Sequence, residues 1–408
     1  MITADIFGSL PDGRCVTKYT LSTHGVSVSV MDFGATVLSV CIPDRTGVAA
    51  DVLLGFGDLA GYLDNPACYG STIGPVANRT DRAEVPLAGR IYHLPANDGP
   101  DHANNLHTDL ARGLHKRLWS TELFEDDNAV RFSCELADGE LGLPGNRRFA
   151  VTYRLDKEAQ KDGADGGVRL EVEHVCETDA ETYVNMTNHS YFNLAGHASG
   201  VCLSQRVSID AETFLPLRAD SVSAGESLSV ADTPFDFRSL KELGADIECG
   251  NAQLDRARGY DHCFCVAGYA RGAAPRHALR AVDDASGRTL DIFITAPGAH
   301  LYTGNWLGDE GAKDAASYGP HDGFAFEPEY YPDAVHHAEW PQPVCAPDRP
   351  YRERIVYRFG VDPDAAGASD VAGPAALRKR PFINRRAAIE TGRVINSIFK
   401  ERIVHASN

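Results

Sequence analysis

Short runs in which apolar and polar residues alternate dominate this 408-residue sequence. From 168 to 173, valine and leucine alternate with arginine and glutamate, and similar runs occur at 290–294 and 355–359. A period of two is typical of a β-strand with one buried face, because successive side chains point to opposite faces. Helical periodicity is scarce before residue 360, and 38 glycines and 22 prolines separate the runs. The sequence therefore predicts an all-β fold, a large antiparallel β-sandwich.

The C-terminal part differs in composition from the rest. Residues 1–359 are expected to form the sandwich domain, whereas residues 360–376, rich in Ala, Gly, Asp and Pro, are typical of a linker. Residues 377–408 contain basic runs such as Arg378-Lys379-Arg380. Behind Asn384, a candidate N-cap, apolar residues recur at helical spacing. We expect a basic C-terminal extension with a short helical tail.

Composition narrows the possible partners and compartment. The chain has 39 Lys+Arg against 57 Asp+Glu, a formal net charge of −18, which disfavours binding to nucleic acid. No apolar run approaches the ~20 residues of a membrane helix, so we expect no membrane insertion. The N-terminus lacks the basic and apolar regions of a secretory signal. The 10 cysteines are scattered without a CxxC pair, which favours free thiols in a cytoplasmic protein and no metal site.

Residues 181–194 carry the most informative pattern. With a period of two, one side of this segment is apolar, and the other carries amides, hydroxyls and rings, including Asn185, His189 and Tyr191. A strand with such a face is typical of the wall of a carbohydrate cleft. The pattern alone leaves two roles open for His189, a site residue or a buried histidine that bonds neighbouring amides.

Three further stretches contain candidate site residues. In Gly74-Pro-Val-Ala-Asn78-Arg79, the guanidinium offers donors for sugar hydroxyls, although a lone arginine is more often a surface charge. His107 ends the stretch Asn104-Asn105-Leu106-His107, in a histidine-rich region whose spacing matches no metal motif. In Tyr260-Asp261-His262, a carboxylate lies beside two rings, although an aspartate alone is usually a turn residue.

Residues 324–334 place Glu327 and Glu329 among phenylalanines and tyrosines. Burial in such a setting raises the pKa of a carboxyl group toward the range that suits a general base. Exposure is the ordinary state of an acidic side chain, but it does not fit the aromatic neighbours of Glu327. The pattern thus indicates a desolvated carboxylate.

Taken together, these stretches resemble the aldose 1-epimerase family, which includes the galactose mutarotases. The matching motifs occur in family order: Gly74-Pro-Val-Ala-Asn-Arg79, Leu106-His107, Leu118-Trp119, Gly142-Leu-Pro-Gly145, Thr187-Asn-His-Ser-Tyr-Phe-Asn-Leu-Ala-Gly196, Tyr260-Asp-His262, Tyr302-Thr-Gly-Asn305 and Tyr331-Pro-Asp-Ala334. They span roughly residues 20–359, nearly all of the chain before the extension.

The resemblance implies a sandwich of the galactose mutarotase type, a monosaccharide substrate and no cofactor. It implies that Glu327 is the general base and His189 the general acid of sugar ring opening. His107 matches a second active-site histidine of the family. The substrate-binding positions of the family correspond to Asn78, Arg79, Asp261 and His300, the last in place of a glutamine.

Several positions depart from the family pattern. Pro75 stands in place of arginine, Thr108-Asp109 in place of Gly-Gly, and Glu327-Pro-Glu329 in place of Glu-Thr-Gln. The preferred aldose is therefore not indicated by the sequence, nor is the oligomeric state. Two other classes stay open on the residues: a glycoside hydrolase, which would use paired carboxylates, and a non-catalytic sugar-binding or regulatory protein on the same fold.

Overall fold

Two layers of antiparallel strands make up the fold in a computed structural model that describes residues 1–157 and 167–362. Most of the expected linker and all of the basic extension lie outside the described residues. Those parts of the domain prediction therefore stay predictions.

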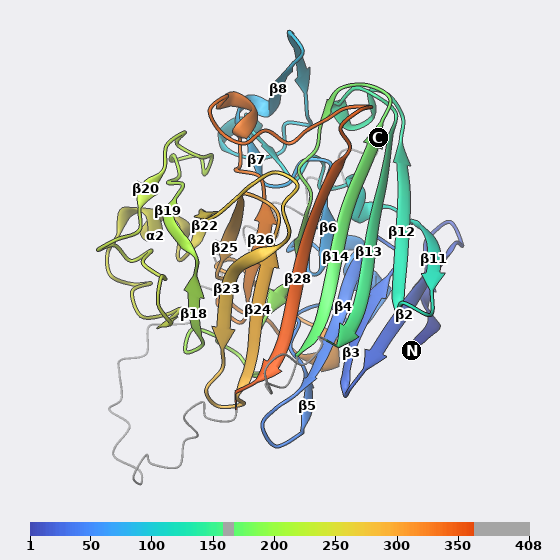
Figure 1. Ribbon diagram of the computed structural model, residues 1–408, viewed down its shortest axis with the longest axis vertical. Helices are drawn as coiled ribbons and strands as arrows, with labels where there is room; N and C mark the ends of the chain where they lie inside the picture. The colour runs from blue at the N-terminus through green and yellow to red at the C-terminus, as the bar shows by residue number, and fades with distance from the viewer. Residues whose placement is uncertain (158–166, 363–408) are drawn as a thin grey trace. The chain divides into compact units, whose positions relative to one another are not determined.

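The first layer is a nine-stranded sheet, whose long strands run side by side in Figure 1. In spatial order the strands are β11 (Ser120–Phe124), β12 (Ala129–Leu136), β13 (Arg147–Lys157), β14 (Val168–Thr178), β28 (Tyr351–Val361), β24 (Arg288–Ile294), β23 (Arg276–Val282), β18 (Arg206–Ile209) and β21 (Lys241–Glu242). In β14, buried and half-buried residues alternate from Val168 to Cys176, as the sequence pattern predicts. β28 ends at Val361, two residues beyond the expected end of the domain.

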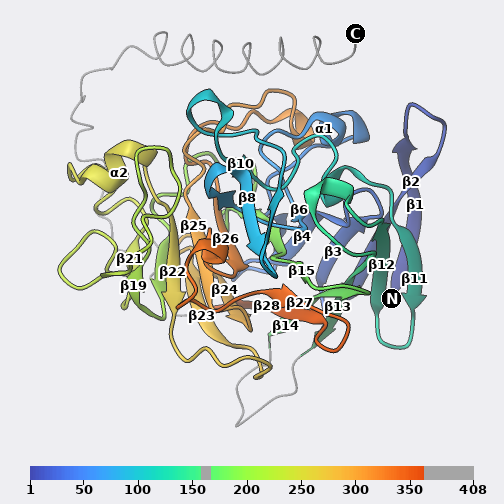
Figure 2. The same cartoon turned by 90° about the horizontal axis from the view of Figure 1, so that it is seen from above.

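The second layer contains two sheets, which lie opposite the first layer when the molecule is seen from above (Figure 2). The six-stranded sheet has the order β17 (Tyr191–Phe192), β26 (Phe324–Glu329), β25 (Gly298–Tyr302), β22 (Asp261–Val266), β19 (Ala211–Phe214) and β20 (Leu228–Ser229). The five-stranded sheet has the order β1 (Ile2–Ser9), β2 (Cys15–Thr23), β3 (Val26–Met31), β4 (Thr36–Pro43) and β5 (Ala49–Asp51).

Apolar side chains from all three sheets pack into one core. Val28 from the five-stranded sheet, Phe324 from the six-stranded sheet, and Val151 and Leu290 from the nine-stranded sheet belong to it, each with no measurable exposure. Burying one such side chain contributes about 1.5–3 kcal/mol relative to leaving it in water. Two inner faces that share a core define a β-sandwich, so the predicted fold class is confirmed.

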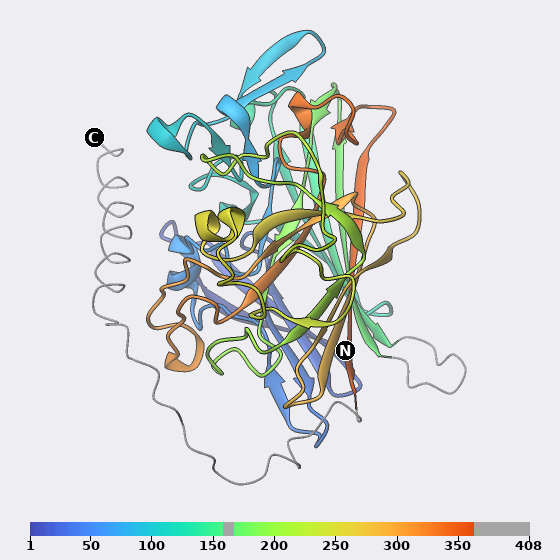
Figure 3. The same ribbon diagram turned by 90° about the vertical axis from the view of Figure 1, so that its left-hand side faces the viewer.

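The remaining elements of the described chain are short pairs of strands, two short α-helices and six short 3₁₀ helices. The pairs are β7 (Arg79–Thr80) with β10 (Asn105–Leu106), β6 (Ser71–Ile73) with β16 (Thr187–His189), β15 (Thr182–Tyr183) with β27 (Val344–Cys345), and β8 (Glu84–Leu87) with β9 (Arg90–His93). The β8–β9 hairpin projects beyond one end of the sheets in Figure 3. The helices α1 (Leu59–Asp64) and α2 (Ala252–Ala257) begin after the side-chain caps Asp58 and Asn251.

Residues 181–194 do not form the single strand that their periodicity suggests. They form β15, β16 and β17, which pair with β27, β6 and β26, respectively. Every residue from 182 to 194 is buried, so neither face of the segment lies on open solvent. Side chains also take part in the backbone hydrogen bonding, since Asn188 Nδ2 donates to the carbonyl of Gly70 at 3.1 Å. Because both faces are buried, the alternation of apolar and polar residues does not show where one short strand ends and the next begins.

Candidate active site

One face of the six-stranded sheet carries three of the seven predicted site residues. The register places Asp261 opposite Tyr302, and His300 opposite Glu327. Directly opposed residues, and residues two apart on one strand, point to the same side of a sheet. Asp261, His300, Tyr302, Glu327 and Glu329 therefore share one face, although they are up to 68 residues apart in sequence (329 − 261).

His189 and Glu327 meet as a buried pair. His189 ends β16, and its Nε2 lies 3.4 Å from Oε2 of Glu327, with 8% and 4% of the two side chains exposed. Burial lowers the pKa of His189 to about 4. Burial, reinforced by the charge of Asp261, raises the pKa of Glu327 well above its usual value. Burial thus favours the neutral form of each group. The pair is therefore suited to hold one proton between them over a wide range of pH.

His107 lies beside this pair because of the β7–β10 pairing. Arg79 pairs with Leu106, which brings Asn78 next to His107. The backbone N–H of Asn78 donates to Nδ1 of His107 at 3.1 Å. Nδ1 is then the acceptor, so the neutral ring carries its proton on Nε2 and can donate with it. The rings of His107 and His189 have centroids 5.4 Å apart, and burial lowers the pKa of His107 well below its usual value.

Arg79 and Asp261 provide two fixed opposite charges. Nε of Arg79 donates to Oδ2 of Asp98 at 2.7 Å. Burial acts to lower the pKa of Arg79, but the charges of Asp261 and Asp98 outweigh it and raise this pKa above its usual value. Burial acts to raise the pKa of Asp261, but the hydrogen bond with His300 and the charge of Arg79 lower it to about 2. A permanent cation and a permanent anion beside His189 and Glu327 can donate to and accept from hydroxyl groups.

His300 and Glu329 lie on the same face of the sheet as Asp261 and Glu327. Nε2 of His300 is 2.7 Å from Oδ1 of Asp261. Nδ2 of Asn78 is 3.1 Å from Nδ1 of His300 and donates to Oε1 of Glu329 at 3.1 Å. Both ring nitrogens of His300 thus face groups of the protein.

Three residues of this region are not among the predicted site residues, although the period of two places Tyr191 on the polar side of residues 181–194. Tyr191 packs against His189 with ring centroids 5.1 Å apart, and Tyr302 packs against Tyr191 at 5.9 Å. Burial raises the pKa of both phenols, which keeps them protonated as donors. Both tyrosines belong to the family-like motifs, so a signal existed. Asp98, the partner of Arg79, lies in a loop, and no pattern in the sequence singles it out.

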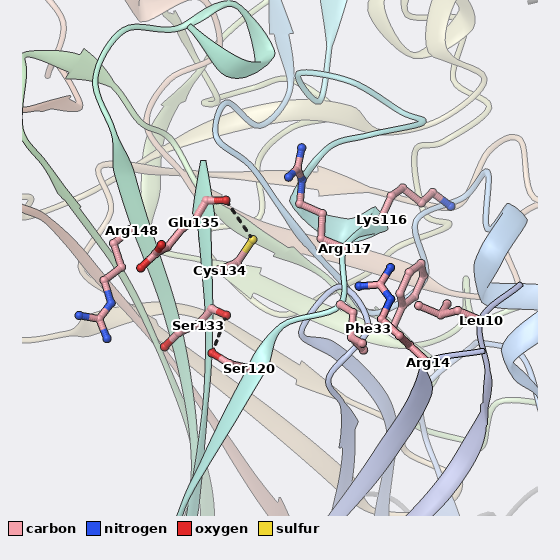
Figure 4. A pocket seen from close by; sticks show the side chains of 11 residues that line it. Leu10, Arg14, Phe33, Lys116, Arg117, Ser120, Ser133, Cys134, Glu135 and Arg148 are labelled. Atoms are coloured by element: carbon pink, nitrogen blue, oxygen red, sulfur yellow. Dashed lines mark hydrogen bonds between the residues drawn. The ribbon is translucent and has the colours of Figure 1, made fainter. Parts of the chain in front are cut away.

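A surface cavity of about 500 Å³ lies apart from these residues (Figure 4). It is lined by Leu10, Arg14, Phe33, Lys116, Arg117, Leu118, Ser120, Ser133, Cys134, Glu135 and Arg148. None of the predicted site residues lines it. Three of its four cations have partners: Arg14 pairs with Asp12, Arg117 pairs with Glu140, and Lys116 Nζ donates to the carbonyls of Leu63 and Asp64. The chemistry described above therefore does not depend on this cavity.

Other properties of the described chain bear on metals, membranes and disulfides. Within residues 1–157 and 167–362, no group of three or more His, Cys, Asp or Glu could hold a metal ion. No helix of that part is long and apolar enough to cross a membrane. All 10 cysteines lie in the described ranges and are free, and five of them are buried.

Comparison with known proteins yields a consistent set of relatives. The family model described as aldose 1-epimerase matches residues 17–358. The galactose mutarotase of Homo sapiens is 37% identical over 363 residues, which cover 88% of this chain and 99% of the relative. The aldose 1-epimerase of Escherichia coli is 33% identical, with 86% and 96% covered. Among solved structures, an aldose epimerase homologue from C. elegans superposes with a TM-score of 0.74 at 27% identity, covering 84% of this chain and 98% of that one.

These matches cover nearly the whole sandwich. They define the class as carbohydrate-active isomerases built on a mutarotase-type β-sandwich. The chain belongs to the aldose 1-epimerase family.

Proposed function

We propose that Glu327 and His189 are the acid–base pair with which this chain interconverts the α and β anomers of a free aldose. Membership of the family makes the chain an isomerase with aldose 1-epimerase activity. The observation that carries the assignment of the pair is the 3.4 Å approach of His189 Nε2 to Glu327 Oε2 in a buried setting. A pair with one shared proton can accept a proton at one oxygen of the sugar and supply one at another.

In the proposed reaction, Glu327 takes the proton from the hydroxyl on C1 while His189 gives a proton to the ring oxygen. The bond between C1 and the ring oxygen breaks, and the electron pair of the former O–H bond completes the C1 carbonyl. Rotation about the C1–C2 bond then presents the other face of the aldehyde. Ring closure runs both transfers in reverse, so the pair returns to its starting state and no co-reactant is consumed.

The neighbouring groups would bind and orient the sugar. His107 can donate from Nε2, because its Nδ1 accepts from Asn78. Arg79 and Asp261 carry the fixed charges that suit donation to and acceptance from hydroxyl groups. We assign these three residues and Asn78 to substrate binding.

The two other classes considered for the sequence fit the site less well. A glycoside hydrolase uses two carboxyl groups, one as acid and one as base or nucleophile. Here Glu327 has the ring of His189 as a partner, at 3.4 Å. A non-catalytic sugar-binding protein would not need two buried groups that both resist a net charge.

Polarimetry on freshly dissolved α-d-glucose and α-d-galactose tests the assignment. The wild-type chain should accelerate mutarotation, and E327Q and H189N should each lose at least about 100-fold in kcat, because each positioned proton transfer contributes about 10²–10⁴-fold. The matched control E122Q removes an acidic side chain that is 63% exposed on β11, and it should behave as wild type. Wild-type rates in E327Q or H189N, with folding confirmed by circular dichroism, would refute the pair.

We further infer that the chain works in a reducing compartment such as the cytoplasm and takes monosaccharides. Support for the compartment comes from the 10 free cysteines, since thiols are kept reduced there. Support for the substrate comes from the family.

A further inference from the structure

A continuous hydrogen-bond network connects Asp261, His300, Asn78 and Glu329. Nε2 of His300 is 2.7 Å from Oδ1 of Asp261, and Nδ1 of the same ring is 3.1 Å from Nδ2 of Asn78. The same Asn78 nitrogen donates to Oε1 of Glu329 at 3.1 Å. The four residues come from β22, the turn before β7, β25 and β26.

Only one assignment of donors and acceptors satisfies every hydrogen bond of this network. An amide nitrogen carries two hydrogens and accepts none, so Asn78 donates one to Glu329 and the other to Nδ1 of His300. Nδ1 is then an acceptor, and the proton of the neutral imidazole is on Nε2. That proton points to Asp261, an acceptor. The amide oxygen of Asn78 accepts from the backbone N–H of Arg79 at 2.7 Å, which fixes the orientation of the amide.

Burial shows which member of the network can contact a ligand. The side chains of His300 and Glu329 are 3% and 1% exposed, whereas that of Asp261 is 18% exposed. Oε2 of Glu329 is buried and has no hydrogen-bond partner among the described residues. Burial, reinforced by the charge of Glu327, raises the pKa of Glu329 well above its usual value, which favours the neutral carboxyl. Asp261 is thus the member of the network that can bind a ligand directly.

We propose that His300 and Glu329 are positioning residues of the sugar site: His300 holds Asp261 in the orientation that binds a sugar hydroxyl, and Asn78 and Glu329 hold His300. The inference rests on the proposed function, since it assumes that Asp261 binds the aldose. It also changes the role expected for His300, which was direct contact with the sugar. With both nitrogens already bonded to the protein, the ring acts through Asp261.

A carboxylate fixed before binding loses less conformational freedom when the sugar arrives. Asp261 would bond a hydroxyl that does not react, so the contact should be of similar strength in the bound sugar and in the transition state. Removing such a contact raises KM and leaves kcat nearly unchanged. This pattern separates positioning of Asp261 from damage to the proton transfers at Glu327 and His189, which would lower kcat.

Two pairs of variants test the proposal by kcat and KM for α-d-glucose and α-d-galactose. H300F keeps a ring but removes both polar atoms, and it should raise KM at least about tenfold while kcat stays within about threefold. H300Q can donate to Asp261 and accept from Asn78, so its KM should stay within about threefold of wild type. E329L should resemble H300F, and E329Q should resemble wild type, because an amide oxygen still accepts from Asn78.

The control H174F places phenylalanine at another buried histidine, in β14 of the opposite sheet, and should leave KM unchanged even if it lowers stability. If H300F does not fold, the E329L and E329Q pair decides the question. Wild-type KM in H300F or E329L, a fall in kcat in place of a rise in KM, or a defect in H300Q equal to that of H300F would overturn the positioning role. A wild-type chain without mutarotase activity would overturn the proposed function and the inference together, whereas an active wild type isolates the inference.

Discussion

Among the individual residues, the behaviour of His189 and Glu327 depends on their burial more than on their type. An exposed histidine and an exposed glutamate would both be charged near pH 6, and water would weaken their interaction. In the site, burial lowers the pKa of His189 to about 4 and raises that of Glu327 well above 4.5. Opposite displacement of two neighbouring groups is a common feature of acid–base sites.

The pH dependence of kcat/KM follows from these directions. A second proton enters the pair only when the pH falls toward the lowered pKa of His189, about 4, and this should abolish the base. The last proton leaves the pair only when the pH rises through the raised pKa of Glu327, and this should abolish the acid. We expect a bell-shaped profile with a broad plateau, whose acid limb lies below the ~6.5 of an ordinary histidine.

Polarimetry over pH 3.5–10, corrected for uncatalysed mutarotation, measures this profile. E122Q, which leaves the site intact, should give the same two limbs as wild type. An acid limb centred near the ordinary histidine value would mean that His189 is not desolvated in the working enzyme, and the assignment of the pair would need revision.

Between elements, Gly70 connects β4 to the strand that carries His189. Its backbone N–H donates to the carbonyl of His189, and its carbonyl accepts from the N–H of Val37, both at 2.9 Å. The φ of Gly70 is +65°, a left-handed conformation that favours glycine. A Cβ at this position would lie 1.9 Å from the carbonyl oxygen of Val37. The backbone, not a flexible side chain, would have to move.

We therefore expect G70A to destabilise the fold and to displace His189. The left-handed conformation costs an alanine about 1–2 kcal/mol, and forced displacement of packed groups adds about 1–3 kcal/mol. The control G13A has a φ of +87° and nothing within 4 Å of its Cβ, so it carries only the conformational cost. Urea unfolding and kcat give the comparison: G70A should lose clearly more stability than G13A and also lose activity. Equal effects of the two variants would show that the backbone around Val37 gives way without moving His189.

The strands also show which parts of the fold the sequence pattern can predict. The alternation in β14 is visible in the sequence because one face of that strand contacts the core and the other is half-exposed. Residues 182–194 are buried on both faces, so their period of two could not reveal that three short strands replace one. Candidate site residues could be named from their types and motifs, but the hydrogen bonds of His300 could not be predicted. They depend on the register between β22, β25 and β26, which is set by the whole sheet.

For the whole molecule, the state of the cysteines is the first quantity to measure. All 10 are free in the structure, including Cys176 and Cys345 in the interior. Protein purified without reductant, denatured and titrated with a thiol reagent should show 10 thiols per chain. Titration after reduction is the control and should give the same number. A lower first value that rises on reduction would indicate disulfides and would argue against the proposed compartment.

The C-terminal extension offers the last test, because the site and the family match both end before it. The proposed site residues lie between Asn78 and Glu329, and the family model ends at residue 358. The alignment with the human galactose mutarotase covers 99% of that protein but 88% of this chain, so the relative has little sequence left to match the extension.

β28 must stay complete, since it lies between β14 and β24 and pairs with both along its length. We expect that a chain truncated after Asp362 keeps kcat and KM within about twofold of wild type. Truncation after Ile355 is the matched control: it removes the half of β28 that carries Tyr357 and Phe359, both buried in the core, and should prevent folding. Loss of activity in the longer truncation, with its fold intact by circular dichroism, would place part of the working site in residues 363–408.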